Sequence, residues 1–176
     1  MRVITGIYKG RRFDIPRTFK ARPTTDFAKE GIFSVIGGYM DFDGAEALDL
    51  FSGTGGITIE MLSRGCRRVV SVEGDREHHA FIKQCIAKIG ATNCVALRDD
   101  VFHFLKSCHI SFDLIFADPP YSLPELRELP QMILSGTLLA DGGLLVLEHG
   151  KHDDFSLNPR FVDHRNYGSV NFSLFR

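Results

Sequence analysis

Short apolar segments alternate with helical segments between residues 45 and 149, and this alternation is the feature that most constrains the fold. The apolar runs are rich in Val, Ile, Leu and Phe, as in EALDLF, RVVSVE and FDLIFA. Parallel strands joined by helices are buried on both faces, so their sequences are continuously apolar rather than alternating. The pattern predicts an α/β fold with a mostly parallel sheet and helices on both faces.

The turn residues divide the chain into expected elements. Thr24, Thr25 and Asp26 are candidate N-caps for a helix that ends at or shortly after Gly37-Gly38. Apolar stretches on either side of Lys9-Gly10 predict an N-terminal β-hairpin, and the tail around 166–168 predicts an antiparallel hairpin. The expected strands are 46–51, 68–73, 94–98, 112–117 and 142–149, and the expected helices are 56–65, 76–90, 101–107 and one near 125–135.

Charge is distributed unevenly along the 176 residues, although the net charge is only −1. Residues 1–22 hold seven Lys/Arg and one Asp, so they carry +6, and the remaining residues carry −7. A basic segment on an acidic body predicts contact with a polyanion such as RNA. We divide the chain into a basic N-terminal hairpin extension (1–22) and one globular domain (23–176). The candidate phosphate-binding cations are Arg2, Lys9, Arg11, Arg12 and Arg22.

Other features exclude several classes of protein. No apolar run approaches the roughly 18 residues that a membrane span needs, and the N-terminus lacks the apolar core of a signal peptide. The four cysteines form no C-x-x-C pair and match no zinc spacing, so we expect reduced structural thiols and no metal. These features predict a cytoplasmic protein, and its mixed surface favours a monomer.

A glycine loop follows the first expected strand in LDLFSGTGGITIE. A dinucleotide fingerprint would need glycine at position 58, where Thr58 stands, and no P-loop lysine follows. The loop instead resembles the motif of S-adenosylmethionine-dependent methyltransferases. That resemblance implies that Asp49 helps to hold the cofactor's ammonium. It also implies that the loop itself contacts the cofactor, through Phe51, Gly53, Thr54 and Gly55.

Acidic residues at the ends of the next two strands extend this prediction. Glu73 lies twenty residues after Gly53, the spacing at which an acid accepts the hydroxyls of a ribose. The third strand ends in LRDDVF, where the same resemblance implies that Asp100 and the backbone of Val101 bind the adenine, with Asp99 as the alternative.

The segment FDLIFADPPY ends a buried strand in an acid, two prolines and an aromatic ring. Prolines have no N–H to donate, so the rigid loop offers acceptors to a ligand that donates hydrogens, such as the exocyclic amine of a base. The Asp118 carboxylate and the Pro119 carbonyl can orient that amine, Pro120 stiffens the loop, and Tyr121 can stack on the base. The tetrapeptide resembles the signature of amino-methyltransferases acting on adenine N6, cytosine N4, guanine N2 or glutamine.

The segments MRVITGIYKGRRF, RPTTDFAKEGIF, LDLFSGTGGITIEMLSRG, FADPPY and YGSV together resemble the bacterial guanine-N2 methyltransferase family named for guanine 966 of 16S rRNA. The resemblance implies a class I, Rossmann-like sheet of seven strands with a C-terminal antiparallel hairpin. It also implies S-adenosylmethionine as cofactor and ribosomal RNA, in the small subunit, as substrate. Phe27 departs from the family, which usually has Arg there.

We expect Thr24 and Thr25 to line the cofactor mouth and Arg22 to contact cofactor or RNA phosphate, although a plain N-cap explains the threonines equally well. Two other functions remain open at this point. An adenine-N6 methyltransferase of DNA or RNA would use the same amine chemistry, and a non-catalytic RNA-binding module for ribosome assembly could retain the fold. The basic head and the absence of room for a recognition domain favour an RNA methyltransferase.

Overall fold

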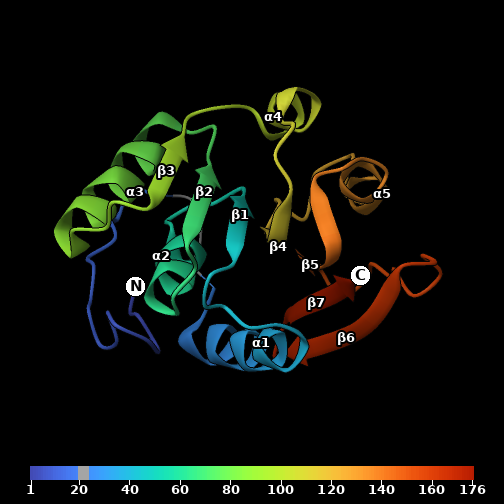
Figure 1. The fold of residues 1–176 in the computed structure, drawn as a ribbon, viewed down its shortest axis with the longest axis horizontal. Helices are drawn as coiled ribbons and strands as arrows, with labels where there is room; N and C mark the ends of the chain where they lie inside the picture. Colours follow the sequence, from blue (N-terminus) through green and yellow to red (C-terminus); the bar gives the residue numbers. More distant parts are fainter. Residues whose placement is uncertain (20–23) are drawn as a thin grey trace.

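The computed structural model describes residues 1–19 and 24–176, and its centre is a single sheet (Figure 1). In these residues seven strands pair in the order β3-β2-β1-β4-β5-β7-β6. The strands are β1 (Glu46–Leu50), β2 (Arg68–Val72), β3 (Cys94–Leu97), β4 (Phe112–Ala117), β5 (Leu139–His149), β6 (Phe161–Tyr167) and β7 (Val170–Phe175).

Strands β1 to β5 run parallel, and β7 pairs antiparallel with both β5 and β6. The chain builds outward from β1 through β2 and β3 on one side and continues through β4 and β5 on the other. The strand order therefore reverses between β1 and β4, which is where ligands bind in sheets of this kind. The predicted mostly parallel sheet and the C-terminal hairpin are both confirmed.

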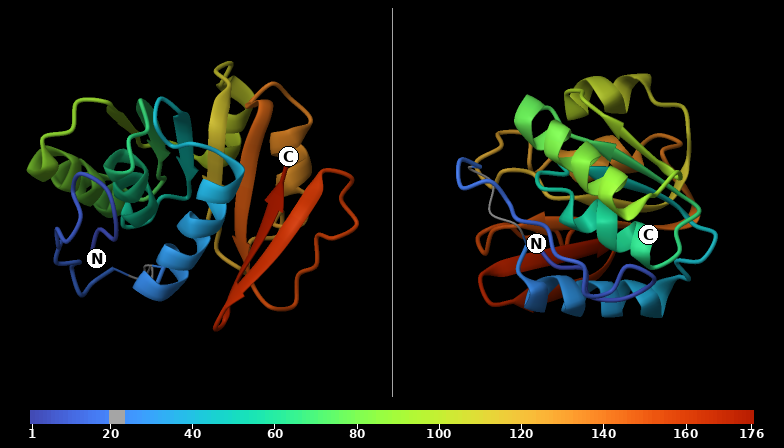
Figure 2. Two further views of the ribbon diagram at one scale, coloured as in Figure 1. Left: turned by 60° about the horizontal axis from the view of Figure 1, so that its bottom comes forward. Right: turned by 90° about the vertical axis from the view of Figure 1, so that its left-hand side faces the viewer.

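Helices cover both faces of the sheet, as predicted (Figures 1 and 2). Phe33 of α1 packs with β4 in a core that also includes α2 and α3, and Phe104 of α4 lies in a second core with α5. Asp75 caps the start of α3, and Gly90 ends that helix with a left-handed φ of 70°. The helices are α1 (Asp26–Tyr39), α2 (Gly56–Ser63), α3 (Arg76–Ile89), α4 (Val101–Ser107) and α5 (Leu129–Leu134).

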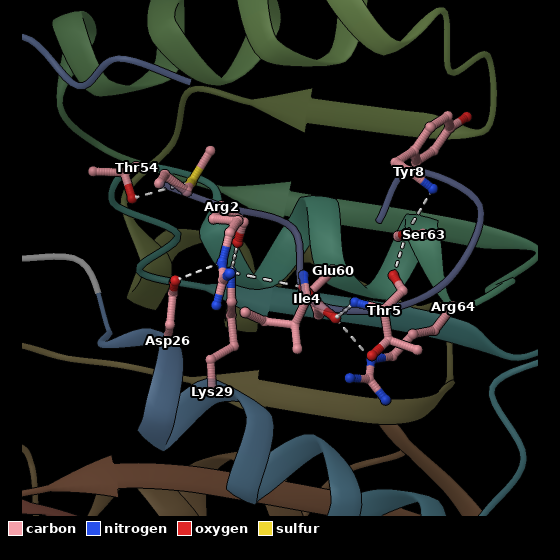
Figure 3. Close-up of polar contacts among 11 residues, drawn as sticks. Arg2, Ile4, Thr5, Tyr8, Asp26, Lys29, Thr54, Glu60, Ser63 and Arg64 are labelled. Atoms are coloured by element: carbon pink, nitrogen blue, oxygen red, sulfur yellow. Dashed lines mark hydrogen bonds and ion pairs between the residues drawn. The ribbon is translucent and has the colours of Figure 1, made fainter. Parts of the chain in front are cut away.

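The N-terminal segment (residues 1–14) differs from the predicted hairpin. Its two arms are joined by one antiparallel bridge, and the residues between form turns rather than strands. The backbone N–H groups of Ile4 and Thr5 donate to the Glu60 carboxylate of α2, at 2.9 and 3.0 Å, and that of Tyr8 donates to Ser63 Oγ (Figure 3). Because these donors bond to α2, they cannot form a regular ladder. The segment runs beside α2 and α3 (Figure 2).

A buried group of charges holds this segment in place. Glu60 is fully buried and accepts a bond from Arg64 Nε at 3.0 Å. Lys29 of α1, also buried, lies 3.7 Å from the same carboxylate and donates to the backbone carbonyl of Arg2 (Figure 3). Desolvation lowers the pKa of Lys29, and the adjacent Glu60 opposes that change. Glu60 thus joins α2 and the N-terminal segment through charge-assisted hydrogen bonds, and α1 through its ion pair with Lys29.

The remaining expectations concern thiols, metals and membranes. Cys66, Cys85, Cys94 and Cys108 are all free thiols, as predicted. Across residues 1–19 and 24–176, no three metal-ligating side chains cluster together. Among the described helices, none combines the length and apolar character that a membrane crossing requires.

Replacing Glu60 by Ala should destabilise the protein by about 3–5 kcal/mol, because Lys29, Arg64 and the backbone N–H groups of Ile4 and Thr5 would lose their partner. Urea unfolding followed by circular dichroism measures this loss, and hydrogen exchange at Ile4 and Thr5 should accelerate. Glu46→Ala is the control, since its ion pair with Arg67 is exposed and should contribute below about 1 kcal/mol. Equal, small losses for the two variants would contradict the role given to Glu60.

Candidate active site

A cavity of about 1150 Å³ opens at the carboxyl ends of the parallel strands. Its walls come from the loops after β1, β2 and β4, from the end of β5, from the N-terminal segment and from the start of α1. The predicted cofactor and catalytic residues that line it are Thr24, Thr25, Asp49, Phe51, Gly53, Thr54, Glu73, Asp118, Pro119, Pro120 and Tyr121. Residues distant in sequence are therefore brought to one chamber at the edge that the strand order indicates.

The loop after β1 turns sharply, because Phe51, Gly53 and Gly55 have left-handed φ values of 58°, 52° and 76°. Such a conformation costs a residue with a Cβ roughly 1–2 kcal/mol, so Phe51 is strained where it lines the cavity. Gly55 does not line the cavity. A Cβ there would lie 2.9 Å from Ile82 Cγ1, so this glycine allows α3 to pack closely against the loop.

Asp49 is a buried carboxyl in the cavity wall, only 1% exposed. Its Oδ2 accepts the hydroxyl of Thr58, and its Oδ1 accepts no hydrogen bond from any described residue. Burial raises the pKa of Asp49 to about 7; the bond from Thr58 opposes this, and the charge of Glu73 adds to it. A buried carboxyl with an unpartnered oxygen fits a cationic ligand group such as an ammonium, which would favour its ionised form.

Glu73 lies at the end of β2 and is tied to the glycine loop. Its Oε2 accepts the backbone N–H of Gly53 at 2.7 Å, and its Oε1 accepts that of Asp75 at 2.8 Å. A carboxylate has about four acceptor positions, so capacity for further donors remains on both oxygens. The fixed carboxylate at the cavity wall fits a ligand with two neighbouring hydroxyls, as in a ribose.

Asp118 begins the Asp-Pro-Pro-Tyr loop directly after β4. Its backbone N–H donates to Leu50 O at 3.2 Å, which joins the ends of β4 and β1. Desolvation raises the pKa of Asp118 well above its usual value, and the charges of Glu148 and Asp49 raise it further. The tyrosine of the loop, Tyr121, is 46% exposed, so much of its ring is open to solvent.

Glu148 was not among the predicted site residues, yet it lines the cavity beside Asp118 and is only 5% exposed. Tyr121 Oη donates to its Oε1 at 2.8 Å, and Thr24 Oγ1 donates to its Oε2 at 3.2 Å. Desolvation raises the pKa of Glu148, and these two hydrogen bonds moderate the increase. The signal was present in the sequence, because Glu148 follows the apolar run LLVL as Asp118 follows LIFA.

The residues predicted to bind adenine lie outside this cavity. Asp100 caps α4 by accepting the N–H of His103 at 2.9 Å, and Val101 is buried in the core beneath that helix. Asp99 contacts the imidazole of His103 at 3.0 Å. These residues follow β3, two strands from the centre of the cavity, so their contact with a cofactor stays a prediction.

Two of the predicted phosphate-binding cations, Arg2 and Arg12, line the cavity. Arg2 Nε forms an ion pair with Asp26 at 2.8 Å, and both side chains are 44% exposed. Arg2 and Arg12, at the two ends of the bridge in the N-terminal segment, therefore add positive charge to a cavity wall that also holds Asp14 and Asp26.

The other predicted cations lie elsewhere. Lys9 is exposed in the turn of the N-terminal segment, and Arg11 Nη1 donates to the backbone carbonyl of Lys88 on α3. Arg22 lies outside the described residues. Thr25, predicted for the cofactor mouth, uses its hydroxyl to cap α1 by accepting the N–H of Ala28.

Comparison with known proteins gives consistent matches over most of the chain. The model of the family described as "Conserved hypothetical protein 95" matches residues 1–176. "Putative rRNA methyltransferase YlbH" of Bacillus subtilis is 37% identical, over 86% of this chain and 83% of its own length. "Ribosomal RNA small subunit methyltransferase D" of Buchnera aphidicola is 30% identical, over 84% and 75%.

The fold is also matched by a solved structure, "Putative methyltransferase yhhF from Escherichia coli". The TM-score is 0.86 at 26% identity, over 99% of this chain and 96% of that one. The arrangement predicted from the alternation of strands and helices is therefore one that a named methyltransferase structure shares over nearly the whole chain.

The raised pKa of Asp49 predicts a pH dependence of stability. Between about pH 4 and pH 7 the folded protein keeps a proton on Asp49 that the unfolded chain has released. The contribution of this carboxyl to the free energy of unfolding therefore falls as pH rises. Over that window the change is on the order of 4 kcal/mol. Asp49→Asn cannot ionise and should gain stability relative to wild type between pH 5 and pH 8 in urea unfolding. If the free energies of unfolding of the two proteins changed in parallel with pH, the raised pKa of Asp49 would be contradicted.

Proposed function

The chain belongs to the family described as conserved hypothetical protein 95, and from that membership we propose that it methylates the N2 amine of a guanine in small-subunit ribosomal RNA. The methyl donor is S-adenosylmethionine. The observation that carries the proposal is the placement of Asp118-Pro119-Pro120-Tyr121 in one chamber with Asp49 and Glu73. The names of relatives, rRNA methyltransferases in two organisms, support the substrate class.

The chamber suits the cofactor at two points. Asp49, whose Oδ1 has no hydrogen-bond partner among the described residues, would hold the ammonium. Glu73 would accept the ribose hydroxyls while it remains bonded to Gly53. When bound, S-adenosylmethionine would supply an electrophilic methyl group, whose bond to sulfur breaks as the bond to nitrogen forms, which leaves S-adenosylhomocysteine. The left-handed turn at Gly53 lets the ligand approach the backbone without a side chain in the way.

Asp118 and Pro119 prepare the amine. The lone pair of guanine N2 is delocalised into the ring, so the amine is a weak nucleophile until it is oriented. The Asp118 carboxylate and the Pro119 carbonyl each accept one N–H, which fixes the nitrogen and stabilises the positive charge that develops as its new bond to carbon forms. One proton then leaves N2 for Asp118, whose raised pKa makes it a better base than an ordinary carboxylate, and passes on to solvent.

RNA approaches from the side of the N-terminal segment. Arg2 and Arg12 in the cavity wall contact phosphates near the target base, and Lys9 and Arg11 contact the backbone further out. The base leaves its stack and enters the chamber, where the half-exposed ring of Tyr121 stacks against it.

Labelled methyl transfer to unmethylated small ribosomal subunits, followed by nucleoside digestion, tests the proposal. We expect N2-methylguanosine with the wild-type protein, and a loss on the order of 100-fold or more with Asp118→Ala, because charge stabilisation at the amine disappears. Asp141→Ala, an exposed acid at the start of β5, should retain full activity.

If the label were found in N6-methyladenosine, the target base would be adenine and not guanine. An unlabelled digest despite bound S-adenosylmethionine would overturn the proposed reaction and favour a non-catalytic role in assembly. Full activity of Asp118→Ala would remove that residue from the chemistry.

A further inference from the structure

Glu148 is a second carboxyl beside Asp118, and the proposed methyl transfer to the amine does not require it. In the parallel pairing of β4 with β5, Ala117 lies opposite Leu147. The next residues, Asp118 and Glu148, therefore stand side by side at the same edge of the sheet, and both line the cavity.

This pairing is unfavourable while both carboxyls are ionised. Two like charges at adjacent positions repel, and Glu148 is almost completely removed from water. A proton on Asp118, whose pKa Glu148 raises, relieves the repulsion, and so do N–H donors of a ligand. Orientation of an amine by Asp118 and a proline carbonyl does not require the second acid, so Glu148 is available for a further N–H donor.

Glu148 is held by donors that leave part of its acceptor capacity free. Tyr121 and Thr24 each donate one hydrogen bond, to different oxygens. A carboxylate has about four acceptor positions, so these two bonds orient the group and leave positions for a ligand. The result is a row of two fixed acceptors, Asp118 and Glu148, in the wall of one chamber.

Two neighbouring hydrogen-bond acceptors match the Watson–Crick edge of guanine better than that of adenine. Guanine carries two neighbouring kinds of donor on its Watson–Crick edge, N1–H and the N2 amine. Adenine carries the N6 amine beside an unprotonated N1, whose lone pair would face a carboxylate and repel it. Desolvated sites that hydrogen-bond a substrate group reject analogues lacking it, because the site's polar group is then left unpaired.

We propose that Glu148 selects guanine by accepting a hydrogen bond from N1–H while Asp118 holds the N2 amine. Tyr121 and Thr24 act through Glu148 by fixing the position of its carboxylate. This inference rests on the proposed function and adds the group by which the site distinguishes guanine from other bases that carry an amine.

The test compares two RNA substrates that differ at one position. The target nucleotide is mapped with the wild-type protein, and small-subunit RNA is prepared with either guanine or 2-aminopurine there. 2-Aminopurine keeps the amine and lacks N1–H. The wild-type protein should favour guanine in kcat/KM by on the order of 10- to 100-fold, the usual effect of one hydrogen bond to a charged group.

Glu148→Gln supplies the second comparison. Its amide can donate to the bare N1 of 2-aminopurine, so the preference for guanine should fall at least tenfold and approach one or invert. Tyr121→Phe and Thr24→Val are matched controls, because each removes a donor to Glu148 and keeps the carboxylate. They should slow both substrates and leave the preference within about threefold of wild type. Binding of S-adenosylmethionine by each variant reports that the cofactor site remains folded.

A wild-type preference near one overturns the assignment without any variant. An unchanged preference in Glu148→Gln overturns it too. The proposed function fails separately: if wild type forms no N2-methylguanosine on guanine RNA, that function and this assignment fall together. If wild type forms N2-methylguanosine but Glu148→Gln keeps the wild-type preference for guanine, only the role given to Glu148 is wrong.

Discussion

Asp49, Asp118 and Glu148 lie at the carboxyl ends of three adjacent parallel strands, where burial raises the pKa of each carboxyl. The charges of Glu148 and Asp49 raise the pKa of Asp118 further. Without a ligand these groups have few ways to lower their energy. A proton, a hydroxyl donor or a bound cation can each lower the energy of these buried carboxyls. The chamber is thus suited to ligands that bring positive charge or N–H donors.

The N-terminal segment contributes positively charged residues to the same cavity. Glu60 and Lys29 hold the N-terminal segment against α2 and α1, and the segment in turn places Arg2 and Arg12 at the cavity. A buried ionic group of this kind contributes little net stability compared with an apolar replacement, but it specifies where a loop lies. Acidic and basic residues therefore line the same chamber, which fits the proposed binding of amines and of RNA phosphates.

The alternation of apolar strands and helices was enough to predict the sheet, because burial on both faces leaves a direct mark on the sequence. The N-terminal hairpin was predicted and is reduced to one bridge, since the backbone donors of Ile4 and Thr5 bond to a helix more than fifty residues away. No local pattern reports such a partner. Glu148 could have been found by the reasoning applied to Asp118. Tyr121 and Thr24 were predicted from the sequence, but their hydrogen bonds to Glu148 required the fold.

The central claim is that desolvated carboxyls at the strand ends hold the amines of cofactor and base. Carbon-13 NMR titration of the Asp and Glu side-chain carboxyls, with and without S-adenosylmethionine, tests it most directly. We expect Asp49, Asp118 and Glu148 to titrate above ordinary carboxyls in the free protein, and added S-adenosylmethionine to lower the pKa of Asp49. Ordinary titration of all three, or an Asp49 signal that does not respond to S-adenosylmethionine, would contradict it.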